Sequence, residues 1–336
     1  MSIKRDMLIP IEPLLFERHF VAKVWGGRAL EQRPGIDLPG TKPIGETWEI
    51  VDRPKENSVV KCGPFRGRTL HDLMGEYADQ ILGSSPVGKD GRFPLLVKYI
   101  DANDNLSVQV HPDEPAAVRL GGDAEAKTEA WYVLDSKPEG VLYCGLRKAV
   151  SRQDFARVAD GPGVVEAMSR WDVQSGQCMF VPGGTVHAIG AGVTILEVQQ
   201  NSDTTFRLWD WGREGRETHV PQALECVRFG ADERGPVVAD RDRADVVGEG
   251  FRGTTLASSD FFCMAELSVE GECRRSTEGR FRIYAVSAGS GHLGLEGRDE
   301  EWTLSTGDVW LVPAVCGYHL LRPGTAGLSL IEMHTP

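Results

Sequence analysis

Three side chains in the first half of the chain have the types and the spacing of metal ligands. Gln109 and His111 are two residues apart in a run that alternates apolar and polar residues, so on a strand they point to the same face. Glu129 opens a second strand-like run, Ala130–Leu134, and would bring a carboxylate to the same place if the two strands are neighbours. An amide oxygen, an imidazole and a carboxylate on one face suggest a cation site.

A fourth ligand is expected from His187. It follows a stretch in which Gly176, Pro182 and Gly184 indicate a tight bend, and a strand that returns from this bend can carry an inward-facing histidine. Either histidine alone would more often be an ordinary core residue. Two imidazoles, a carboxylate and an amide oxygen suit Zn²⁺, with one position open for water or substrate. The set predicts one Zn²⁺ per chain, held by Gln109, His111, Glu129 and His187.

Composition and charge limit the class of protein. The chain has 336 residues, 41% of them hydrophobic, and no apolar run approaches the roughly 18 residues that span a bilayer, so we expect a globular protein without a membrane partner. The start of the chain lacks the apolar block of a secretory signal, which indicates a cytoplasmic protein. A net charge of −12 argues against nucleic acid as a partner, and an anionic substrate would need a local basic patch. Seven cysteines without a Cys-x-x-Cys pair favour reduced thiols over a disulfide framework or a thiolate zinc site.

The hydrophobic pattern predicts a mainly β protein. Short apolar runs separated by Gly, Pro and Asp recur in the first sixty residues, where Glu46 and Glu49 are interpreted as structural or surface residues. The spacing of apolar residues predicts a helix over residues 69–82, with Thr69 as its cap, and Pro221 opens a short helix over residues 221–229.

The same pattern divides the chain into two domains. Residues 1–230 form the first, and residues 147–170 within it have helical periodicity and are predicted to be a small helical insertion. Residues 231–250 are charged and rich in glycine and are interpreted as a linker. Residues 251–336 form the second domain.

The second domain looks like a copy of the first without its metal ligands. The spacing of Trp, Gly and Val-Pro that leads to His187 recurs between residues 302 and 318, where Tyr318 replaces the histidine. Alignment of the preceding strands puts Phe281 in the place of Glu129. His319 is one residue out of register, so we expect it to face the opposite side of its strand. The repeat predicts two β barrels and one metal site.

Two short motifs and several longer runs resemble known proteins. The spacing Gly-x5-Pro-x-Gly-x2-His that ends at His187 resembles the second motif of the cupin superfamily, and Gln109-Val-His111 resembles its first motif with glutamine in place of the leading histidine. Over residues 12 to 225 the chain resembles the type I mannose-6-phosphate isomerases of the short bacterial form. The runs that carry this resemblance are KVWGG, GETWEI, LSVQVHPDEPAA, KTEAWYVL and PGGTVHAIGAGVTILEVQQNSDTTFRLWDWGR.

The resemblance implies both a fold and a reaction. The fold would be two cupin-like jelly-roll barrels with the small helical insertion in the first. The reaction would interconvert mannose 6-phosphate and fructose 6-phosphate by proton transfer through an enediolate, with a small sugar phosphate as partner and a monomer or homodimer as the assembly. Such a reaction needs a base, a proton shuttle and an electrophile, and Zn²⁺ can be the electrophile or can hold the sugar near the base.

Five further residues are candidates for the site. Lys127 is two residues before Glu129, hence on the same strand face, and beside Zn²⁺ in a partly desolvated pocket it could act as the base. The resemblance places Asp203 and Arg207 in the site, Asp203 to relay a proton and Arg207 to stabilise the enediolate or hold the substrate. Candidates for the phosphate contacts are Ser107 and Lys98. The chain lacks the large helical insertion of longer family members, which leaves open the identity of the phosphate-holding residues that those members supply from it. The metal ligands are unaffected.

Two other functions are compatible with the same ligands. An iron-dependent cupin dioxygenase also uses histidines and a carboxylate, but it usually has His-x-His where this chain has Gln-x-His. A non-catalytic sugar-binding cupin would have no chemical use for Lys127, Asp203 and Arg207. Neither a phosphate-binding Gly-x-x-x-x-Gly-Lys loop nor a Gly-x-Gly-x-x-Gly turn is present, so nucleotides are not expected.

Overall fold

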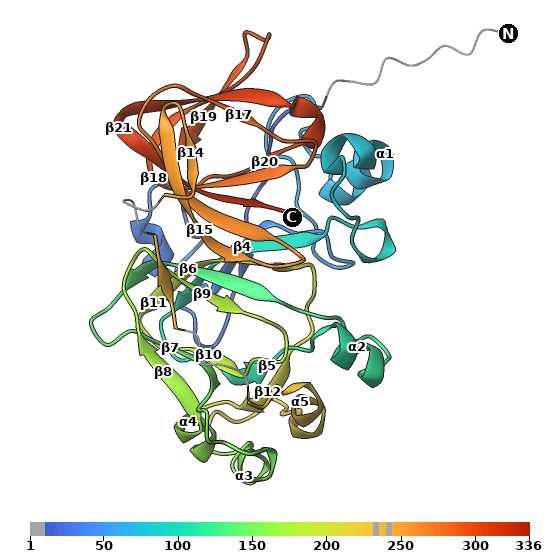
Figure 1. Cartoon of the computed structure of the whole chain (residues 1–336), viewed down its shortest axis with the longest axis vertical. Helices are drawn as coiled ribbons and strands as arrows, with labels where there is room; N and C mark the ends of the chain where they lie inside the picture. Colours follow the sequence, from blue (N-terminus) through green and yellow to red (C-terminus); the bar gives the residue numbers. More distant parts are fainter. Residues whose placement is uncertain (1–10, 231–234, 240–243) are drawn as a thin grey trace, which may run out of the picture.

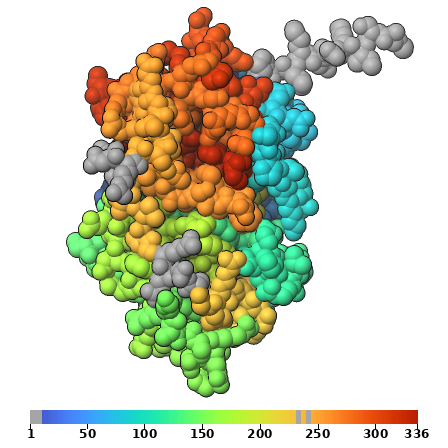
Figure 2. All heavy atoms as spheres, viewed as in Figure 1, coloured from blue at the N-terminus to red at the C-terminus, as the bar shows by residue number. Residues whose placement is uncertain are grey.

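The computed structural model describes residues 11–230, 235–239 and 244–336. Its strands pair antiparallel in three sheets and its helices are few and short, so the chain is mainly β as predicted. Most strands before residue 210 lie in the lower part of Figure 1, and the strands after residue 245 form the orange and red upper part. Figure 2 shows the two parts in close contact, with helix α1 (Leu70–Leu82) against the side of the upper one.

A seven-stranded sheet forms the middle layer. In order across it are β13 (Val237–Val238), β9 (Gln177–Val181), β6 (Glu129–Ser136), β11 (Val193–Gln200), β4 (Leu95–Ala102), β3 (Glu46–Ile50) and β2 (His19–Val21). Trp131 and Val133 of β6 face one hydrophobic core, and Ala130 and Tyr132 face another. The sheet is therefore buried on both faces, which explains why every residue of β4 is buried and why apolar and polar residues do not alternate along it.

A five-stranded sheet covers one face of the middle layer. In order across it are β12 (Phe206–Trp209), β5 (Val108–Val110), β10 (His187–Ile189), β7 (Val141–Leu146) and β8 (Met168–Asp172). Leu142 and Ile189 of this sheet pack with Ile100 and Trp131 of the middle layer in one buried cluster. Side chains at the ends of these strands therefore meet between the two sheets.

A nine-stranded sheet covers the other face. Its main path is β1 (Leu14–Leu15), β20 (Val309–Val312), β18 (Arg282–Leu295), β21 (Tyr318–His334), β16 (Cys263–Val269), β15 (Phe251–Ser258) and β14 (Val246–Gly248), with β17 (Cys273–Ser276) paired to β21 and β19 (Glu301–Ser305) paired to β18. Ile283 and Met333 of this sheet pack in the same core as Val97 and Tyr99 of β4. The three sheets thus form three layers.

The helices lie at the edges of the layers, and four of the five α-helices in the described ranges were predicted. Helix α1 begins after Thr69, whose side chain forms a capping box with Asp72. The predicted insertion contains α3 (Arg152–Ala156) and α4 (Gly163–Glu166), and β8 begins inside it. The remaining helices are α2 (Glu114–Leu120), α5 (Val220–Cys226), η1 (Ala29–Gln32), η2 (Lys89–Gly91) and η4 (Ala314–Cys316). Helix α2 was not predicted, although Asp113 caps it and Gly121 ends it. No helix in the described ranges is long and apolar enough to cross a membrane.

The predicted domain boundary does not separate the hydrophobic core. Strand β1 pairs with β20, and Leu70 of α1 shares a buried cluster with Phe262 and Phe281. Of the predicted linker, residues 231–234 and 240–243 lie outside the described residues, while its other parts include β13, which pairs with β9, and β14, which pairs with β15. The division into two domains and the closure of the sheets into two barrels stay predictions.

The predicted orientation of His319 is wrong. His319 is fully buried, whereas Tyr318 is 49% exposed. Nδ1 of His319 lies 3.2 Å from the carbonyl oxygen of Gly317, just as Nδ1 of His187 lies 2.8 Å from that of Thr185, two residues earlier in each case. His319 is therefore the counterpart of His187.

The strand register corrects the second half of the alignment. Val312 pairs with Arg282 in the nine-stranded sheet, as Val181 pairs with Glu129 in the middle layer. Arg282, and not Phe281, thus stands in the place of Glu129. The turn that contains η4 is one residue longer than the turn before His187, which explains the error at His319. The error at Phe281 is separate, because the register aligns Trp131 with Tyr284 rather than with Ile283.

Candidate metal centre

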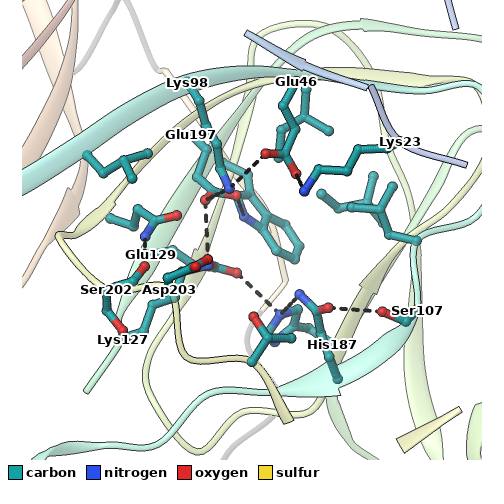
Figure 3. Close-up of a pocket in the computed structure, with 18 of the residues that line it drawn as sticks. Lys23, Glu46, Lys98, Ser107, Lys127, Glu129, His187, Glu197, Ser202 and Asp203 are labelled. Carbon is teal, nitrogen blue, oxygen red and sulfur yellow. Dashed lines mark hydrogen bonds and ion pairs between the residues drawn. The ribbon is translucent and has the colours of Figure 1, made fainter. Parts of the chain in front are cut away.

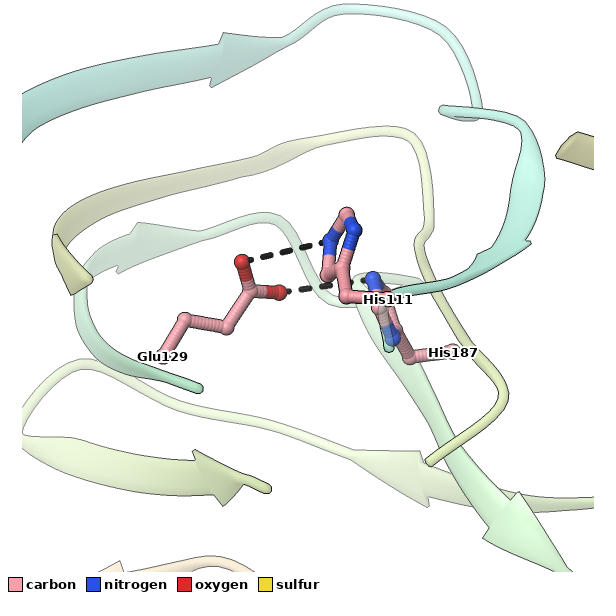
Figure 4. A group of neighbouring side chains, drawn as sticks. All are labelled: His111, Glu129 and His187. Atoms are coloured by element: carbon pink, nitrogen blue, oxygen red, sulfur yellow. Dashed lines mark ion pairs between the residues drawn. The ribbon is translucent and has the colours of Figure 1, made fainter. Parts of the chain in front are cut away.

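Three of the four predicted ligands meet between the middle layer and the five-stranded sheet. His111 directly follows β5, Glu129 opens β6 and His187 opens β10, and one ligand atom of each lies within 4.8 Å of the others (Figure 4). Nε2 of His111 is 3.4 Å from Oε2 of Glu129, and Nε2 of His187 is 3.3 Å from Oε1. Within the described ranges this is the only group of three or more His, Cys, Asp or Glu side chains placed to hold a metal ion.

Both imidazoles are held in the form that a metal requires. Nδ1 of His111 is 2.8 Å from the carbonyl oxygen of Thr204, and Nδ1 of His187 is 2.8 Å from that of Thr185, so each Nδ1 carries the proton and each Nε2 lone pair points inward. Burial lowers the pKa of His187, and burial together with the charge of Lys127 lowers the pKa of His111 to about 3. Both rings are therefore neutral, as metal ligation requires.

Gln109 reaches the same centre. It pairs directly with His187 across β5 and β10, and its Nε2 donates to Nε2 of His187 at 3.2 Å. Ser107 donates its hydroxyl to Oε1 of Gln109 at 3.1 Å. Rotation of the amide about its last bond would exchange oxygen and nitrogen and turn the oxygen toward the centre.

The donor set fits a cation. Oε2 of Glu129 is buried and has no hydrogen bond of acceptable geometry, although Nζ of Lys127 is 2.8 Å away. Two inward imidazole nitrogens, this carboxylate and the amide of Gln109 match the nitrogen and oxygen ligands that Zn²⁺ takes in catalytic sites.

A row of alternating charges leads through the pocket to the metal centre (Figure 3). In order, it contains Lys23, Glu46, Lys98, Glu197, Lys127 and Glu129, and successive Nζ–Oε distances lie between 2.8 and 3.9 Å. Only Lys23 is substantially exposed, at 33% of its side chain. Each lysine is thus balanced by a carboxylate on at least one side.

Neighbouring charges in this row shift the pKa values of its members and so keep them ionised. Burial alone would raise the pKa of Glu129, but the charge of Lys127 lowers it well below its ordinary value. Burial alone would lower the pKa of Lys98, but Glu197 and Glu46 outweigh this and raise it. Lys98 therefore stays an ammonium ion and is unsuited to act as a base.

The other candidate residues line the same cavity, which has a volume of about 260 Å³. Arg207 of β12 pairs with Gln109 in the strand register, one strand away from the ligands. Its Nη1 donates to the carbonyl oxygen of Glu217 at 2.6 Å. The predicted residues that line the cavity are Lys98, Ser107, Gln109, Lys127, Glu129, His187, Asp203 and Arg207; His111 is buried beside them.

Sequence reasoning missed two carboxylates of the site. Glu46 was interpreted as structural or surface, yet it is buried and lines the cavity. Glu197 was not singled out, although it pairs directly with Lys98 across β11 and β4 and accepts a hydrogen bond from Trp131 at 2.9 Å. The signal was available, because a lysine in the apolar run of β4 requires an opposite charge on a neighbouring strand.

The chain is similar in sequence to mannose-6-phosphate isomerases. A family model described as phosphomannose isomerase type I, catalytic domain, matches residues 14–144. A mannose-6-phosphate isomerase of Streptococcus mutans is 34% identical over 309 residues, which is 90% of this chain and 92% of that protein.

Solved structures of mannose-6-phosphate isomerases have the same fold as this chain. The crystal structure of the mannose 6-phosphate isomerase from Bacillus subtilis superposes with a TM-score of 0.83 at 30% identity, covering 96% of this chain and all of that one. A mannose 6-phosphate isomerase solved with bound zinc and yttrium has the same fold, with a TM-score of 0.76 at 16% identity over 97% of this chain and all of that one.

Proposed function

Since the chain belongs to the type I mannose-6-phosphate isomerase family, we propose that it interconverts mannose 6-phosphate and fructose 6-phosphate through an enediolate, with one Zn²⁺ per chain. The observation that supports this most is the joining of His111, Glu129 and His187 in one buried group, with Lys127 in contact with Glu129. A site that only bound sugar would have no chemical use for a base beside the ligands, although Lys127 also balances the charge of Glu129.

The proposed ligands are Gln109, His111, Glu129 and His187. They lie on β5, β6 and β10 or, for His111, directly after β5, so the packing of two sheets holds them in place. A bound Zn²⁺ would supply a Lewis acid that polarises a substrate oxygen. A related structure that holds zinc supports this choice of metal.

Proton transfer is assigned to residues around the ligands. Nζ of Lys127 lies 2.8 Å from Glu129 and 3.2 Å from Nε2 of His111, which puts it at the centre of the site, where a base could remove a proton from one sugar carbon and return it to the next. Asp203 lines the same cavity and is proposed to carry the proton between the two oxygens. The guanidinium of Arg207 is proposed to stabilise the negative charge of the enediolate.

Ser107 and Lys98 stay the proposed contacts for the phosphate group of the substrate. Ser107 lines the cavity beside Gln109. Lys98 is 3.1 Å from Glu197 and 3.9 Å from Glu46, so its charge is already balanced before a phosphate arrives. The cytoplasmic location and the assembly as a monomer or homodimer also stay predictions.

A coupled assay that follows fructose 6-phosphate formed from mannose 6-phosphate tests the function. We expect turnover, its loss on treatment with a chelator, and its return with added Zn²⁺ at about one ion per chain. Binding of the sugar phosphate without turnover would favour the sugar-binding alternative. Oxygen consumption with an iron-loaded sample would favour the dioxygenase.

A further inference from the structure

A second cavity lies beside the turn that leads to His187, and it is separate from the metal-centre cavity. The two cavities have no lining residue in common. Strand β7 lines the second cavity with Cys144 and Leu146, and the turn between β9 and β10 lines it with Thr185 and Val186. Its volume of about 230 Å³ is close to the 260 Å³ of the metal-centre cavity, so it can hold a molecule of similar size.

The charged side chains of this second cavity are all basic, and we call it the basic cavity. Arg147, Lys148 and Arg228 line it, and none of its described lining residues is an aspartate or a glutamate. Arg147 is exposed, and its Nε donates to the carbonyl oxygen of Met168 at 3.2 Å, a neutral partner that does not balance the charge. The chain as a whole has a net charge of −12, so positive charge is concentrated here against the overall balance. The lining therefore favours an anionic ligand.

The same cavity also has an apolar part. Phe180, Pro182 and Val186 line it together with the basic residues. Nε and Nη2 of Arg228 donate to Oδ2 of Asp113 at 3.0 and 2.8 Å, which fixes the direction of this side chain. Guanidinium groups bind phosphate oxygens in a fork, and a phosphate ester carries close to two negative charges at neutral pH. A phosphate ester with a small apolar body matches both parts of the lining.

The lining is joined to both metal-binding histidines by hydrogen bonds. The carbonyl oxygen of Thr185 lies 2.8 Å from Nδ1 of His187, so a residue of the basic cavity orients a metal ligand. The backbone N–H of Arg228 donates to the carbonyl oxygen of Gly184 at 2.9 Å, and the N–H of Gly184 donates to that of His111 at 2.7 Å. Changes to such outer partners typically alter metal affinity or activity by about 10- to 100-fold. An occupant of the basic cavity is therefore placed to act on the metal centre.

We propose that the basic cavity is a regulatory site for a small organic phosphate ester, and that the bound ester lowers turnover by shifting the turn that orients His187. The phosphate group accepts hydrogen bonds from Arg147 and Arg228, and the apolar body lies against Phe180 and Val186. The site is additional to the proposed isomerase function, because the reaction is assigned to the other cavity. Its effect passes through Thr185 and needs no contact between the ester and the sugar.

Calorimetric titration with phenyl phosphate tests the binding, because this probe joins a phosphate group to a small apolar ring. Saturating mannose 6-phosphate is present throughout, so that the metal-centre cavity is already occupied. We expect one molecule of phenyl phosphate per wild-type chain and an affinity about 10-fold lower in Arg147→Gln, the loss typical of a hydrogen bond to a charged group. Arg147→Lys keeps the charge but not the fork and should give an intermediate affinity.

The matched control is Arg170→Gln. Arg170 is an exposed arginine of β8, the strand paired with β7, and it does not line the basic cavity. This variant removes the same charge and should bind phenyl phosphate like the wild type. Absence of binding by the wild type, or equal affinities of the wild type and Arg147→Gln, would overturn the site. An equal loss in Arg147→Gln and Arg170→Gln would also overturn it, since net charge alone would then explain the binding.

Steady-state kinetics test the effect on the metal centre. At saturating mannose 6-phosphate, phenyl phosphate should lower kcat of the wild type and of Arg170→Gln by about 5-fold or more. Arg147→Gln should need about 10-fold more phenyl phosphate for the same fall. Competitive inhibition alone, with a raised KM, an unchanged kcat and no difference among the three proteins, would overturn the regulatory effect while leaving the isomerase function intact.

If the wild type does not isomerise the sugar phosphate, the proposed function fails but the basic cavity can still be tested. The titrations are then made without the sugar, and equal binding by the wild type, Arg147→Gln and Arg170→Gln would overturn the site. The rate of Zn²⁺ release to a chelator reports the effect on His187 without any turnover. Phenyl phosphate should raise this rate in the wild type and in Arg170→Gln more than in Arg147→Gln, and an unchanged rate in all three would overturn the effect.

Discussion

Glu129 and Lys127 are two residues apart, share a face and do different work. Replacing Glu129 with Gln removes the negative charge from the ligand set, so metal should bind more weakly and activity should return partly at high added Zn²⁺. Lys127→Met leaves all four ligands, so metal should stay bound while kcat falls by about 10²- to 10⁴-fold, as for a missing general base. Metal content and kcat measured over a range of Zn²⁺ concentrations separate the two effects. Loss of metal from Lys127→Met, or a near-normal kcat with a raised KM, would move the base to Asp203 or His111.

His319 is a second inward-facing histidine, and it makes stability depend on pH. It is buried in the nine-stranded sheet, where its Nε2 lies 2.8 Å from the hydroxyl of Tyr284, and burial lowers its pKa to about 4. The unfolded chain binds the proton with an ordinary pKa of about 6.5, so the free energy of unfolding should fall as the pH falls from about 6.5 to about 4, by on the order of 2–3 kcal/mol.

His319→Gln tests this by urea unfolding at pH 7 and at pH 4.5. The difference in unfolding free energy between the two pH values should shrink in this variant and should be unchanged in His292→Gln, which alters an exposed histidine of β18. Metal content should be the same in all three proteins, because His319 faces Tyr284 and not the metal centre. An unchanged pH dependence in His319→Gln would show that other groups carry it.

At the scale of elements, a buried ion pair joins the neighbouring strands β4 and β11. Lys98 of β4 and Glu197 of β11 are direct partners in the register and are both buried, so Glu197→Leu should destabilise the metal-free protein by about 3–5 kcal/mol because Lys98 loses its closest partner. Adding Lys98→Met to this change should recover part of the loss. Urea unfolding of the two single variants and the double variant measures the coupling.

An exposed ion pair serves as the control for the buried pair of Lys98 and Glu197. Arg157 and Asp154 form an ion pair at α3 with more than 60% of each side chain exposed, so Arg157→Ala should lower the free energy of unfolding by no more than about 0.5 kcal/mol. If the losses of unfolding free energy in Lys98→Met and Glu197→Leu simply add in the double variant, the two charges do not stabilise each other.

The elements differ in how far they could be predicted from the sequence. The ligand strands were predictable because a period of two places Gln109 and His111 on one face and the turn before His187 is rich in glycine and proline. The role of Glu197 could not be predicted, because its pairing with Lys98 depends on β11 and β4 being neighbours in the sheet. The predicted orientation of His319 was wrong because one extra residue in the preceding turn moves this side chain from one face of its strand to the other.

At the scale of the whole molecule, one core joins the predicted domains. Val97 of the middle layer, Leu70 of α1 and Met333 of the nine-stranded sheet belong to the same buried cluster. We therefore expect a single cooperative unfolding transition, with equal calorimetric and van't Hoff enthalpies. Hydrogen exchange should give the same limiting opening free energy for amides of β4 and β18. Two separate transitions would show that the predicted domains fold independently despite this core.

The pairing of β1 with β20 has a consequence for synthesis on the ribosome. Leu14 and Leu15 have their strand partners at Leu311 and Trp310, close to the other end of the chain. At about 5–20 residues per second, the roughly 300 residues between them take about 15–60 s to be made. During that time Leu14 and Leu15 have no partner strand, so this edge of the nine-stranded sheet can form only after β20 has been made.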